Sequence, residues 1–463
     1  MKRYIIIIIV GVGLQSCLVT KNYKQPENIV LEEQYRTDHL SRDSLSIANI
    51  SWKEFFQDRK LRVLIDTVLV ENIDIRIALE QINAAESYYK QGKNIQLPAF
   101  SINANVGNQS FSKNSQFGSV FDGTLTQYEL AGALSWEADI WGKINSQQKA
   151  FKAQYLSAAE AHKAVKTRLI LNVATSYYQL VALDKQLDVA EKTLKNREEG
   201  IEVTQALKEA GMSNELAVQR AITQKVATEE IILNLKHNIL LLENTLSILM
   251  GKPSQKIDRN SFEQLIFPEG NTDKGYPIQL LSNRTDVRAA EYNLAQAFEM
   301  TQHAKASLYP SLRIDFSAGL QSLDFNSLFS SNSLFTNLLG SLTQPILNRR
   351  QLKTQVEVAR SNEEIALLNF KYAILNASKE VSDSYNDLIT TQAKIKLKEE
   401  ELKAFNEAAD ISNEMQKFGI GTYLDVLTAE QGQLNAELEL INLKNKVLID
   451  QAQLYRALGG GWQ

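Results

Sequence analysis

The sequence contains little cysteine, proline or histidine. Cys17 is the single cysteine among 463 residues, which excludes a disulfide within the chain and nearly excludes a zinc–thiolate site built by one copy. Seven prolines are present, but none lies between Pro98 and Pro253 and none follows Pro345. Because an interior proline costs a helix about 3 kcal/mol, these long proline-free stretches favour long helices.

Signs of catalysis are also lacking. The four histidines, His39, His162, His237 and His303, are widely separated and do not have the spacing of metal ligands, so we expect them at surface or packing positions. The sequence contains no Gly-x-Ser-x-Gly, phosphate-binding loop or His-Glu-x-x-His motif. We therefore predict that the protein is not an enzyme and has no catalytic residue, resident metal or cofactor.

The N-terminus has the features of a targeting segment. Lys2 and Arg3 precede the apolar run Ile5–Leu14, which is too short to span a bilayer as a helix. The run ends in Leu-Gln-Ser-Cys, which resembles a bacterial lipoprotein signal cleaved before the cysteine. We expect residues 1–16 to be a signal peptide and Cys17 to carry acyl chains, although an incidental cysteine near a cleavage site is the alternative. Removal of the two basic residues shifts the formal net charge from −4 to −6, which disfavours a nucleic-acid partner.

The chain is an internal duplication. LPAFSINANVG, from Leu97, returns as YPSLRIDFSAG, from Tyr309, at an offset of 212 residues. The same offset carries NIDIRIAL, from Asn72, onto RTDVRAAE, from Arg284. Neither half of such a duplicated unit can bury its apolar stripes alone. We expect five segments: the signal (1–16), an extended anchor segment (17–57), the first repeat (58–250), an inter-repeat equatorial segment (251–277) and the second repeat (278–463).

Each copy contains two segments in which apolar and polar residues alternate. The period of two predicts strands at Phe100–Val106, Tyr128–Trp136, Leu312–Leu320 and Leu338–Leu342. Lengths of about ten residues fit tilted membrane-spanning strands. A soluble hairpin with one wet face would show the same alternation. The lipoprotein-like start and the absence of a spanning helical run favour membrane strands, and aromatic residues near the strand ends fit an interfacial girdle: Phe111, Tyr128, Trp136 and Trp141.

Helical periodicity dominates the remainder. The pattern is helical at 58–94, and a long helix is predicted from 142 to about 209, roughly 65 residues or on the order of 100 Å. Its counterpart runs from about 349 to 417. Each long helix turns at a glycine (Gly211, Gly419) and returns as a shorter helix that ends near Met250 or Leu458. Helices of this length, with apolar or small residues on more than one side, predict a coiled coil or a helical tube.

Three local motifs carry a family resemblance. They are WEADIWGK from Trp136, LTQPIL from Leu342 and FGIGTYLDVLTA from Phe418, and they occur in fixed order within the duplicated chain. Over residues 58–458 the sequence resembles the TolC family of outer-membrane efflux channels, in its lipid-anchored OprM/NodT-like branch.

The resemblance implies a fold that is mainly α with a membrane β-barrel, built from internally duplicated protomers. Three copies would form a homotrimer in which each chain contributes four strands to one 12-stranded barrel in the outer membrane. A periplasmic α-helical barrel would continue it. Closure removes the open edges that four strands alone would leave in lipid. The implied partners are outer-membrane lipid, a periplasmic adaptor (membrane fusion) protein and an inner-membrane transporter of RND type. The implied activity is passive, gated exit of drugs or other small toxic compounds.

The resemblance also indicates gate residues. It places Asp425 where family members have a carboxylate facing the pore, so that three copies would form an acidic ring. The alternative role for Asp425 is stabilisation of the first turn of its helix. Gly421 stands where a gate arginine can occur and Thr428 where a second aspartate can occur. In the first copy Ala217 replaces another carboxylate, with Glu215 close by.

The same resemblance assigns the helix turns to docking. Gly211 and Met212 in the first copy, and Gly419 and Ile420 in the second, match the tips that contact the adaptor in this family. Glycine at these positions also has a purely structural role, because it allows the left-handed turn that ends a long helix.

Two alternative functions share parts of this pattern. One is the outer-membrane duct of type I protein secretion, which has the same fold. The other is a periplasmic adaptor or a structural coiled-coil lipoprotein. An adaptor would have one helical hairpin beside a lipoyl-like β domain, whereas this sequence predicts two hairpins in tandem and paired strands in both copies.

Overall fold

The computed structural model describes residues 20–26, 41–42, 50–120, 123–265, 274–275, 283–418 and 420–462. The chain divides into two compact units. The first contains Ile82–Ala158 and Ala289–Phe370, which include all four long strands. The second contains Ala159–Arg288 and Lys371–Gln463, which include the two helical hairpins. No helix in these described ranges combines the length and mean hydropathy needed to cross a bilayer.

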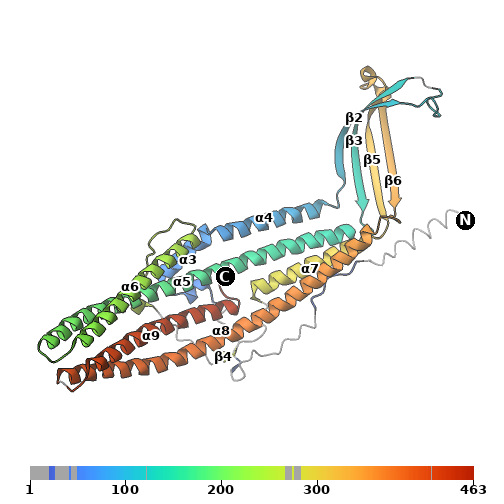
Figure 1. Cartoon of the computed structure of the whole chain (residues 1–463). Helices are drawn as coiled ribbons and strands as arrows, with labels where there is room; N and C mark the ends of the chain where they lie inside the picture. Colours follow the sequence, from blue (N-terminus) through green and yellow to red (C-terminus); the bar gives the residue numbers. More distant parts are fainter. Residues whose placement is uncertain are drawn as a thin grey trace. The chain divides into compact units, whose positions relative to one another are not determined.

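The elements of the two copies are labelled in Figure 1, and all their pairs except β3 and β6 have equal lengths. The paired helices are α4 (Ile73–Asn94) and α7 (Thr285–Ala306) with 22 residues, α5 (Lys143–Glu209) and α8 (Gln351–Lys417) with 67, and α6 (Glu215–Leu249) and α9 (Tyr423–Ala457) with 35. The paired strands are β2 (Ala99–Ser110) and β5 (Ser311–Ser322) with 12 residues, and β3 (Thr124–Ala138) and β6 (Leu334–Thr343) with 15 and 10. The predicted duplication is confirmed. The offset is 212 residues at α4 and 208 at α5, since the strand connections differ in length.

Short elements complete the described chain. They are β1 (Ser41–Arg42), which pairs in parallel with β4 (Lys274–Gly275), and α2 (Trp52–Phe55), α3 (Arg59–Glu71), η2 (Phe262–Gln264), η4 (Phe325–Ser327) and η5 (Ser331–Ser333). The last two lie in the connection between β5 and β6.

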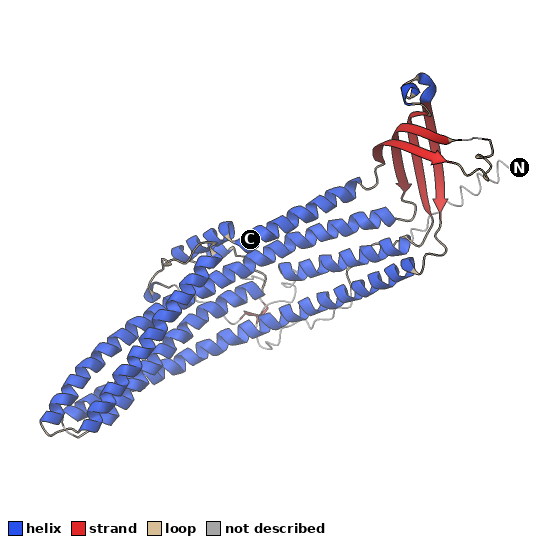
Figure 2. Cartoon of the chain, turned by 45° about the horizontal axis from the view of Figure 1, so that its top comes forward, coloured by secondary structure: helices blue, strands red, loops and turns tan. Residues whose placement is uncertain are grey.

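The four long strands form one antiparallel sheet in the order β2-β3-β5-β6. Figure 2 shows the strands side by side, in red. Directly opposed residues point to the same face, so the register brings Phe100, Leu134, Phe316 and Leu338 into one row. The adjacent row contains Ile102, Gly132, Ala318 and Thr336, so this part of the face is mainly apolar. The predicted alternation therefore produces one mainly apolar face that includes strands of both copies.

The opposite face is polar and closely packed at one glycine. Its rows contain Glu129 opposite Gln321 and Glu137 opposite Arg313. Gly319 lies on this face opposite Ala131, and a Cβ at position 319 would overlap the backbone of β3. The equivalent Gly107 lies on edge strand β2 and has open space around it. Only the interior copy of this repeated glycine is therefore required by packing.

The helical pattern predicted over 58–94 is present, but Asn72 divides it into two helices, α3 and α4. Asn72 has an extended backbone, with φ −64° and ψ 133°. Its side-chain oxygen accepts hydrogen bonds from the N–H groups of Asp74 (2.9 Å) and Ile75 (3.3 Å), which caps α4. An asparagine followed two residues later by an aspartate is a capping signal that the apolar periodicity obscured.

Equivalent side chains close the two repeats. In the first copy Asn72 Nδ2 donates to the carbonyl of Leu249, near the end of α6, at 2.8 Å. In the second copy Arg284, the residue aligned with Asn72, donates from Nη1 to the carbonyl of Ala457, at the end of α9, at 3.1 Å. Both bonds satisfy a carbonyl in the last turn of a helix, which has no partner within that helix.

The largest apolar core lies in the second unit. Leu61, Ile65 and Val68 of α3 are at most 1% exposed and pack with residues of α5, α6 and α9. Leu64 and Leu69 are partly buried against the same core. Each fully buried aliphatic side chain stabilises the fold by about 1.5–3 kcal/mol relative to an exposed one. The side chains of α3 therefore contribute strongly to the stability of this core.

Candidate gate and docking tips

The first hairpin turn follows a standard helix-ending geometry. Gly211 has a φ of +75° and donates its N–H to the carbonyl of Lys208 at 3.0 Å. Met212 donates to the carbonyl of Leu207 at 2.8 Å. This pair of bonds is the Schellman motif, which needs a residue that tolerates positive φ. The structural role expected of Gly211 is therefore present.

The second turn repeats this geometry. Ile420, the counterpart of Met212, donates its N–H to the carbonyl of Met415 at 3.0 Å. Gly419 lies outside the described residues. The ends of α6 and α9 use the same motif, with Gly251 at φ +66° and Gly459 at φ +95°. The same type of helix C-terminal turn therefore occurs in both hairpins.

Large apolar side chains are exposed at both turns. Met212 is 69% exposed and Ile420 is 75% exposed, and their neighbours Leu216, Phe418 and Leu424 are exposed as well. Adjacent exposed apolar side chains are common on surfaces that bind a partner. This exposure supports the docking prediction for Met212 and Ile420.

Asp425 begins the return helix of the second hairpin. Its Oδ2 accepts hydrogen bonds from the Thr422 hydroxyl (2.6 Å) and the Thr422 N–H (3.0 Å), which form a capping box. These bonds, the hydroxyl first, hold the pKa of Asp425 below its ordinary value. The side chain is exposed, so it stays ionised and available to a pore. The helix-capping alternative and the acidic-ring prediction are therefore compatible.

The first hairpin has different chemistry at the same place. Ala217, the counterpart of Asp425, offers no carboxylate, and its N–H donates to the side chain of the N-cap residue Asn214 at 3.0 Å. Glu215 is bound instead by Lys208 at 2.6 Å and Gln219 at 2.7 Å. The Lys208 ammonium lowers the pKa of Glu215. Within the chain, Glu215 and Asp425 are each held by their own turn and are not brought together.

The two remaining predicted gate positions have local partners. The Thr428 hydroxyl donates to the carbonyl of Leu424 at 2.8 Å, the usual arrangement for threonine on an exposed helix face. A Cβ at Gly421 would lie 2.9 Å from the Cβ of Met415. A side chain at position 421 would therefore require a shift at the end of α8.

Sequence reasoning missed a buried polar link between the hairpins. Arg197 of α5 is 5% exposed and donates to the carbonyl of Gln224 and the hydroxyl of Thr228 in α6, and to the side chain of Gln431 in α9. Burial lowers the pKa of Arg197 and raises that of the nearby Glu430. Arg197 lies in a charged stretch of sequence, which is typical of a solvent-exposed helix face. No local signal therefore indicated that it is buried.

The residues that follow Cys17 contact the first unit, although Cys17 itself lies outside the described residues. The backbone N–H of Lys21 donates to Gln302 at 3.2 Å, and the side chain of Asn22 accepts from Lys149 at 2.9 Å. Thr20 lies against Gly142, directly before α5. The segment is therefore held close to the end of strand β3.

Aromatic side chains lie at both ends of the sheet. At one end Trp136 donates from Nε1 to the carbonyl of Gln96 at 2.9 Å, and Trp141 stacks on Tyr309 with ring centroids 5.1 Å apart. At the other end Tyr128 contacts Phe325 at 5.5 Å. Amphipathic rings at both ends of a strand layer are typical of the two membrane interfaces.

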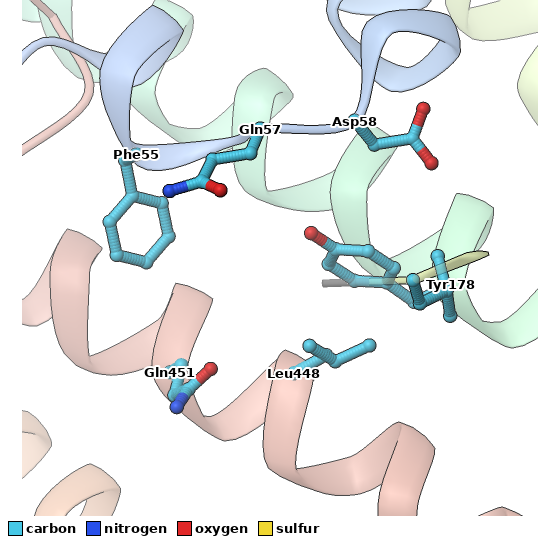
Figure 3. A pocket seen from close by; sticks show the side chains of 7 residues that line it. Phe55, Gln57, Asp58, Tyr178, Leu448 and Gln451 are labelled. Atoms are coloured by element: carbon cyan, nitrogen blue, oxygen red, sulfur yellow. The ribbon is translucent and has the colours of Figure 1, made fainter. Parts of the chain in front are cut away.

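A small cavity in the second unit has a structural role. It has a volume of about 20 Å³, enough for one water, and is lined by Asp58, Tyr178 and Leu448 among others (Figure 3). Asp58 caps α3 and also accepts hydrogen bonds from the Tyr177 hydroxyl at 2.8 Å and Asn260 at 3.0 Å. Burial raises the pKa of Tyr178. Across the described residues, no group of three or more His, Cys, Asp or Glu side chains could hold a metal ion.

Two segments of the chain match the family model described as outer membrane efflux protein, at residues 64–252 and 277–460. The chain therefore belongs to the outer membrane efflux protein family. Each match covers one copy of the duplicated unit.

Individual relatives agree over nearly the whole length. The chain is 27% identical to the cation efflux system protein CusC of Escherichia coli O6:H1 (strain CFT073) over 466 residues, covering 98% of each chain. It is 27% identical to the solvent efflux pump outer membrane protein SrpC of Pseudomonas putida over 458 residues, covering 97% of this chain and 96% of the relative.

Solved structures share the fold. A crystal structure of CusC has a TM-score of 0.84 at 25% identity, covering 96% of this chain and 100% of that chain. The outer-membrane channel OprN has a TM-score of 0.87 at 23% identity, with coverage of 96% and 100%. The predicted family, fold class, outer-membrane localisation and role in efflux are confirmed.

Proposed function

We propose that three copies of this chain form a passive, gated exit duct of a tripartite efflux system. The duct would receive small toxic compounds through a periplasmic adaptor from an inner-membrane transporter of RND type. The observation that carries this proposal is the sheet. It is antiparallel, mainly apolar on one face, and unpaired at β2 and β6 within the described chain.

The sheet fits lipid better than water. Its strands have 10 to 15 residues, and about 9–11 tilted residues span a bilayer. On the edge strands Phe100, Ile102 and Leu338 are at least 68% exposed, so the apolar face has no cover within the chain. An open edge leaves backbone groups unsatisfied in hydrocarbon, which neighbouring copies would correct by joining β2 to β6.

Two helices also carry apolar stripes that need neighbours. On α6, Val226, Leu233 and Leu240 follow one another at seven-residue spacing and are 56–68% exposed. On α8 a second stripe of the same spacing contains Val358, Ile365 and Tyr372, which are 53–69% exposed. Seven-residue spacing is the pattern of a seam between supercoiled helices. Two uncovered seams per chain suit a closed ring of copies.

The range of cargo among relatives supports a passive duct. Relatives of 26–27% identity are named for cations, solvents, toluene or antibiotics. Since similarity to this chain is nearly constant across these names, cargo selection belongs to the pump. The same names favour efflux of small compounds over protein secretion. The adaptor alternative required one hairpin, whereas the chain has two and belongs to the outer-membrane family.

The lipid anchor and the tips complete the proposal. Thr20 lies three residues after Cys17, and three extended residues span about 10 Å, so acyl chains at Cys17 would reach the apolar sheet. The exposed turns at Met212 and Ile420 would dock the adaptor. Asp425 would line the constriction, with Gly421, Thr428 and Glu215 beside it.

Assembly and conduction test the proposal together. Purified protein is expected to run as a trimer in detergent and to open threefold ion-conducting pores in a planar bilayer. Leu233→Glu with Leu240→Glu should prevent trimer formation by placing charge in one seam. The matched control, Asn234→Glu, adds a charge one position outside the stripe and should leave the trimer intact. A wild-type monomer that does not conduct would refute the duct.

A further inference from the structure

A cavity in the second unit is surrounded by cationic and donor groups. Its volume is about 230 Å³, whereas a water occupies about 30 Å³. It lies among α5, the start of α7 and the residues at and after the end of α9. The lining residues used below are Thr167, Arg168, Arg284, Asp286, Arg456 and Trp462.

The charge around the cavity is positive. Arg284 is 3% exposed and is held by Asp286, at 2.6 and 3.0 Å, and by Glu380 at 2.7 Å. Arg456 shares the same Glu380 at 3.2 Å. Arg168 has no ion-pair partner in the part of the chain that the structure describes. Two carboxylates thus face three guanidinium groups, and one positive charge remains uncompensated.

Three hydrogen-bonding groups around the cavity are unsatisfied. The Thr167 hydroxyl, Arg456 Nε and Trp462 Nε1 are each buried without a partner among the described residues, and Thr167 is 9% exposed as a whole. Buried polar atoms nearly always have a partner, so three exceptions around one space call for an explanation. Arginine and the indole N–H only donate, which means that the missing partner is an acceptor.

The start of α7 adds to the positive electrostatic potential in the cavity. Thr285 and Asp286 line the cavity, and the first N–H groups of a helix present the positive end of its dipole. A water could accept the hydrogen bonds, but it would leave the positive charge uncompensated. An anion with several oxygens satisfies both requirements.

We propose that this cavity binds a small oxyanion, for which inorganic phosphate is the simplest probe. The free guanidinium of Arg168 and the half-used guanidinium of Arg456 bind the anion oxygens. Thr167 and Trp462 donate the remaining hydrogen bonds. The anion joins α5, α7 and the segment after α9, at the point where the second repeat begins. The proposed binding of an anion here does not depend on transport.

The test measures phosphate binding by calorimetry to the purified, detergent-solubilised protein in chloride buffer. Wild type is expected to bind phosphate saturably at one site per chain. Arg168→Gln is the first variant, because an exposed arginine without an ion-pair partner is not needed for folding, and it should weaken binding about tenfold. Thr167→Val keeps the shape of the side chain and removes the hydroxyl, and it should weaken binding severalfold.

Arg288→Gln is the matched control. Arg288 is on α7 and pairs with Glu160 at 3.2 Å, but it does not line the cavity. Phosphate affinity should be unchanged in this variant. Equal weakening by Arg168→Gln and Arg288→Gln would mean a diffuse charge effect and would overturn the proposal. So would a wild-type protein without saturable binding, as expected if a carboxylate of a neighbouring copy occupies the cavity.

Discussion

The two helical hairpins have the same lengths and the same end geometry, but their interiors use different chemistry. In the first hairpin Arg197 donates to the Gln224 carbonyl and the Thr228 hydroxyl. The equivalent position, 208 residues later, is Phe405, whose ring lies against Gly432. Gly432 is itself the counterpart of Gln224. One hairpin thus buries a guanidinium, whereas the other has a partly buried aromatic ring at the equivalent position.

The same divergence occurs where each repeat closes. Asn72 and Arg284 occupy equivalent positions and bond equivalent helix-end carbonyls, but Arg284 is also embedded between two carboxylates. These two contacts therefore occupy equivalent places in the two copies, although the interacting groups differ.

The largest expected effect concerns these closing residues. Arg284→Leu would leave Asp286 and Glu380 without their buried partner, and we expect a loss of about 3–5 kcal/mol in the free energy of unfolding. Asn72→Ala removes a cap and one neutral hydrogen bond and should cost about 1–3 kcal/mol. Chemical denaturation followed by helical circular dichroism measures both. If the two variants lost the same free energy of unfolding, Asp286 and Glu380 would have to be well solvated in the absence of the Arg284 side chain.

These closing residues also show what the sequence could and could not predict. The long helices and the positions of the four strands followed from periodicity, proline placement and the glycine turns, which are local signals. The break at Asn72 was missed because apolar spacing continues through it. The burial of Arg197 and the Asp58–Tyr177–Asn260 contacts depend on partners distant in sequence, and a charged residue that becomes buried has no local signature. The gate residues came from family resemblance alone.

The next effect tests the hairpin interiors. Gly432→Ala would push a methyl group into the ring of Phe405, and overpacking of this kind costs about 1–3 kcal/mol. Gln224→Ala changes the equivalent position of the first hairpin, where only the backbone carbonyl bonds Arg197. Its effect should stay within about 0.5 kcal/mol. Thermal unfolding of the two variants checks the difference. If Gly432→Ala stabilises the protein through helix propensity, the ring has room to move and the contrast between the interiors is small.

The carboxylates at the two hairpin tips differ in their partners, because Glu215 pairs with the Lys208 ammonium whereas Asp425 accepts hydrogen bonds from Thr422. Asp425→Asn should weaken block of the reconstituted pore by a trivalent cation about tenfold, equivalent to about 1.4 kcal/mol. The amide oxygen can still accept from Thr422, so the helix start is kept. Glu215→Gln is the control, because Lys208 already neutralises Glu215, and block should be nearly unchanged. Single-channel recording in planar bilayers measures both.

The pH dependence of block provides a second check on Asp425. Its pKa lies below the ordinary aspartate value, so the carboxylate stays charged when the pH falls from 7 to 5. The capping stabilisation is likewise present above the unfolded-state pKa and is lost only as the pH falls through the lower folded-state pKa. Block should therefore be constant between pH 7 and pH 5. Relief of block within that range would point to a different titrating group at the constriction.

The smallest expected effect lies where the strands lead into the long helices. Gly142, before α5, has a φ of +76°, and its counterpart before α8 is Arg350, which has a φ of +66°. A side chain in this left-handed region costs about 1–2 kcal/mol, whereas glycine adopts it freely. Arg350→Gly should therefore stabilise the protein by about 0.5–1 kcal/mol after the entropy cost of glycine. Gly142→Ala should destabilise it, because the new Cβ would also lie 2.6 Å from the Thr20 hydroxyl oxygen.

The ion pair of Arg350 has to be separated from its backbone strain. Arg350 bonds Glu357 at 2.9 Å, but both side chains are more than half exposed, and such pairs contribute about 0–1 kcal/mol. Measuring Arg350→Gly in a Glu357→Gln background removes this contribution from the comparison, so that the shift in thermal midpoint reports the backbone alone. A midpoint that falls in that background would mean that arginine is held at positive φ without strain. The two strand-to-helix junctions would then differ in sequence but not in energy.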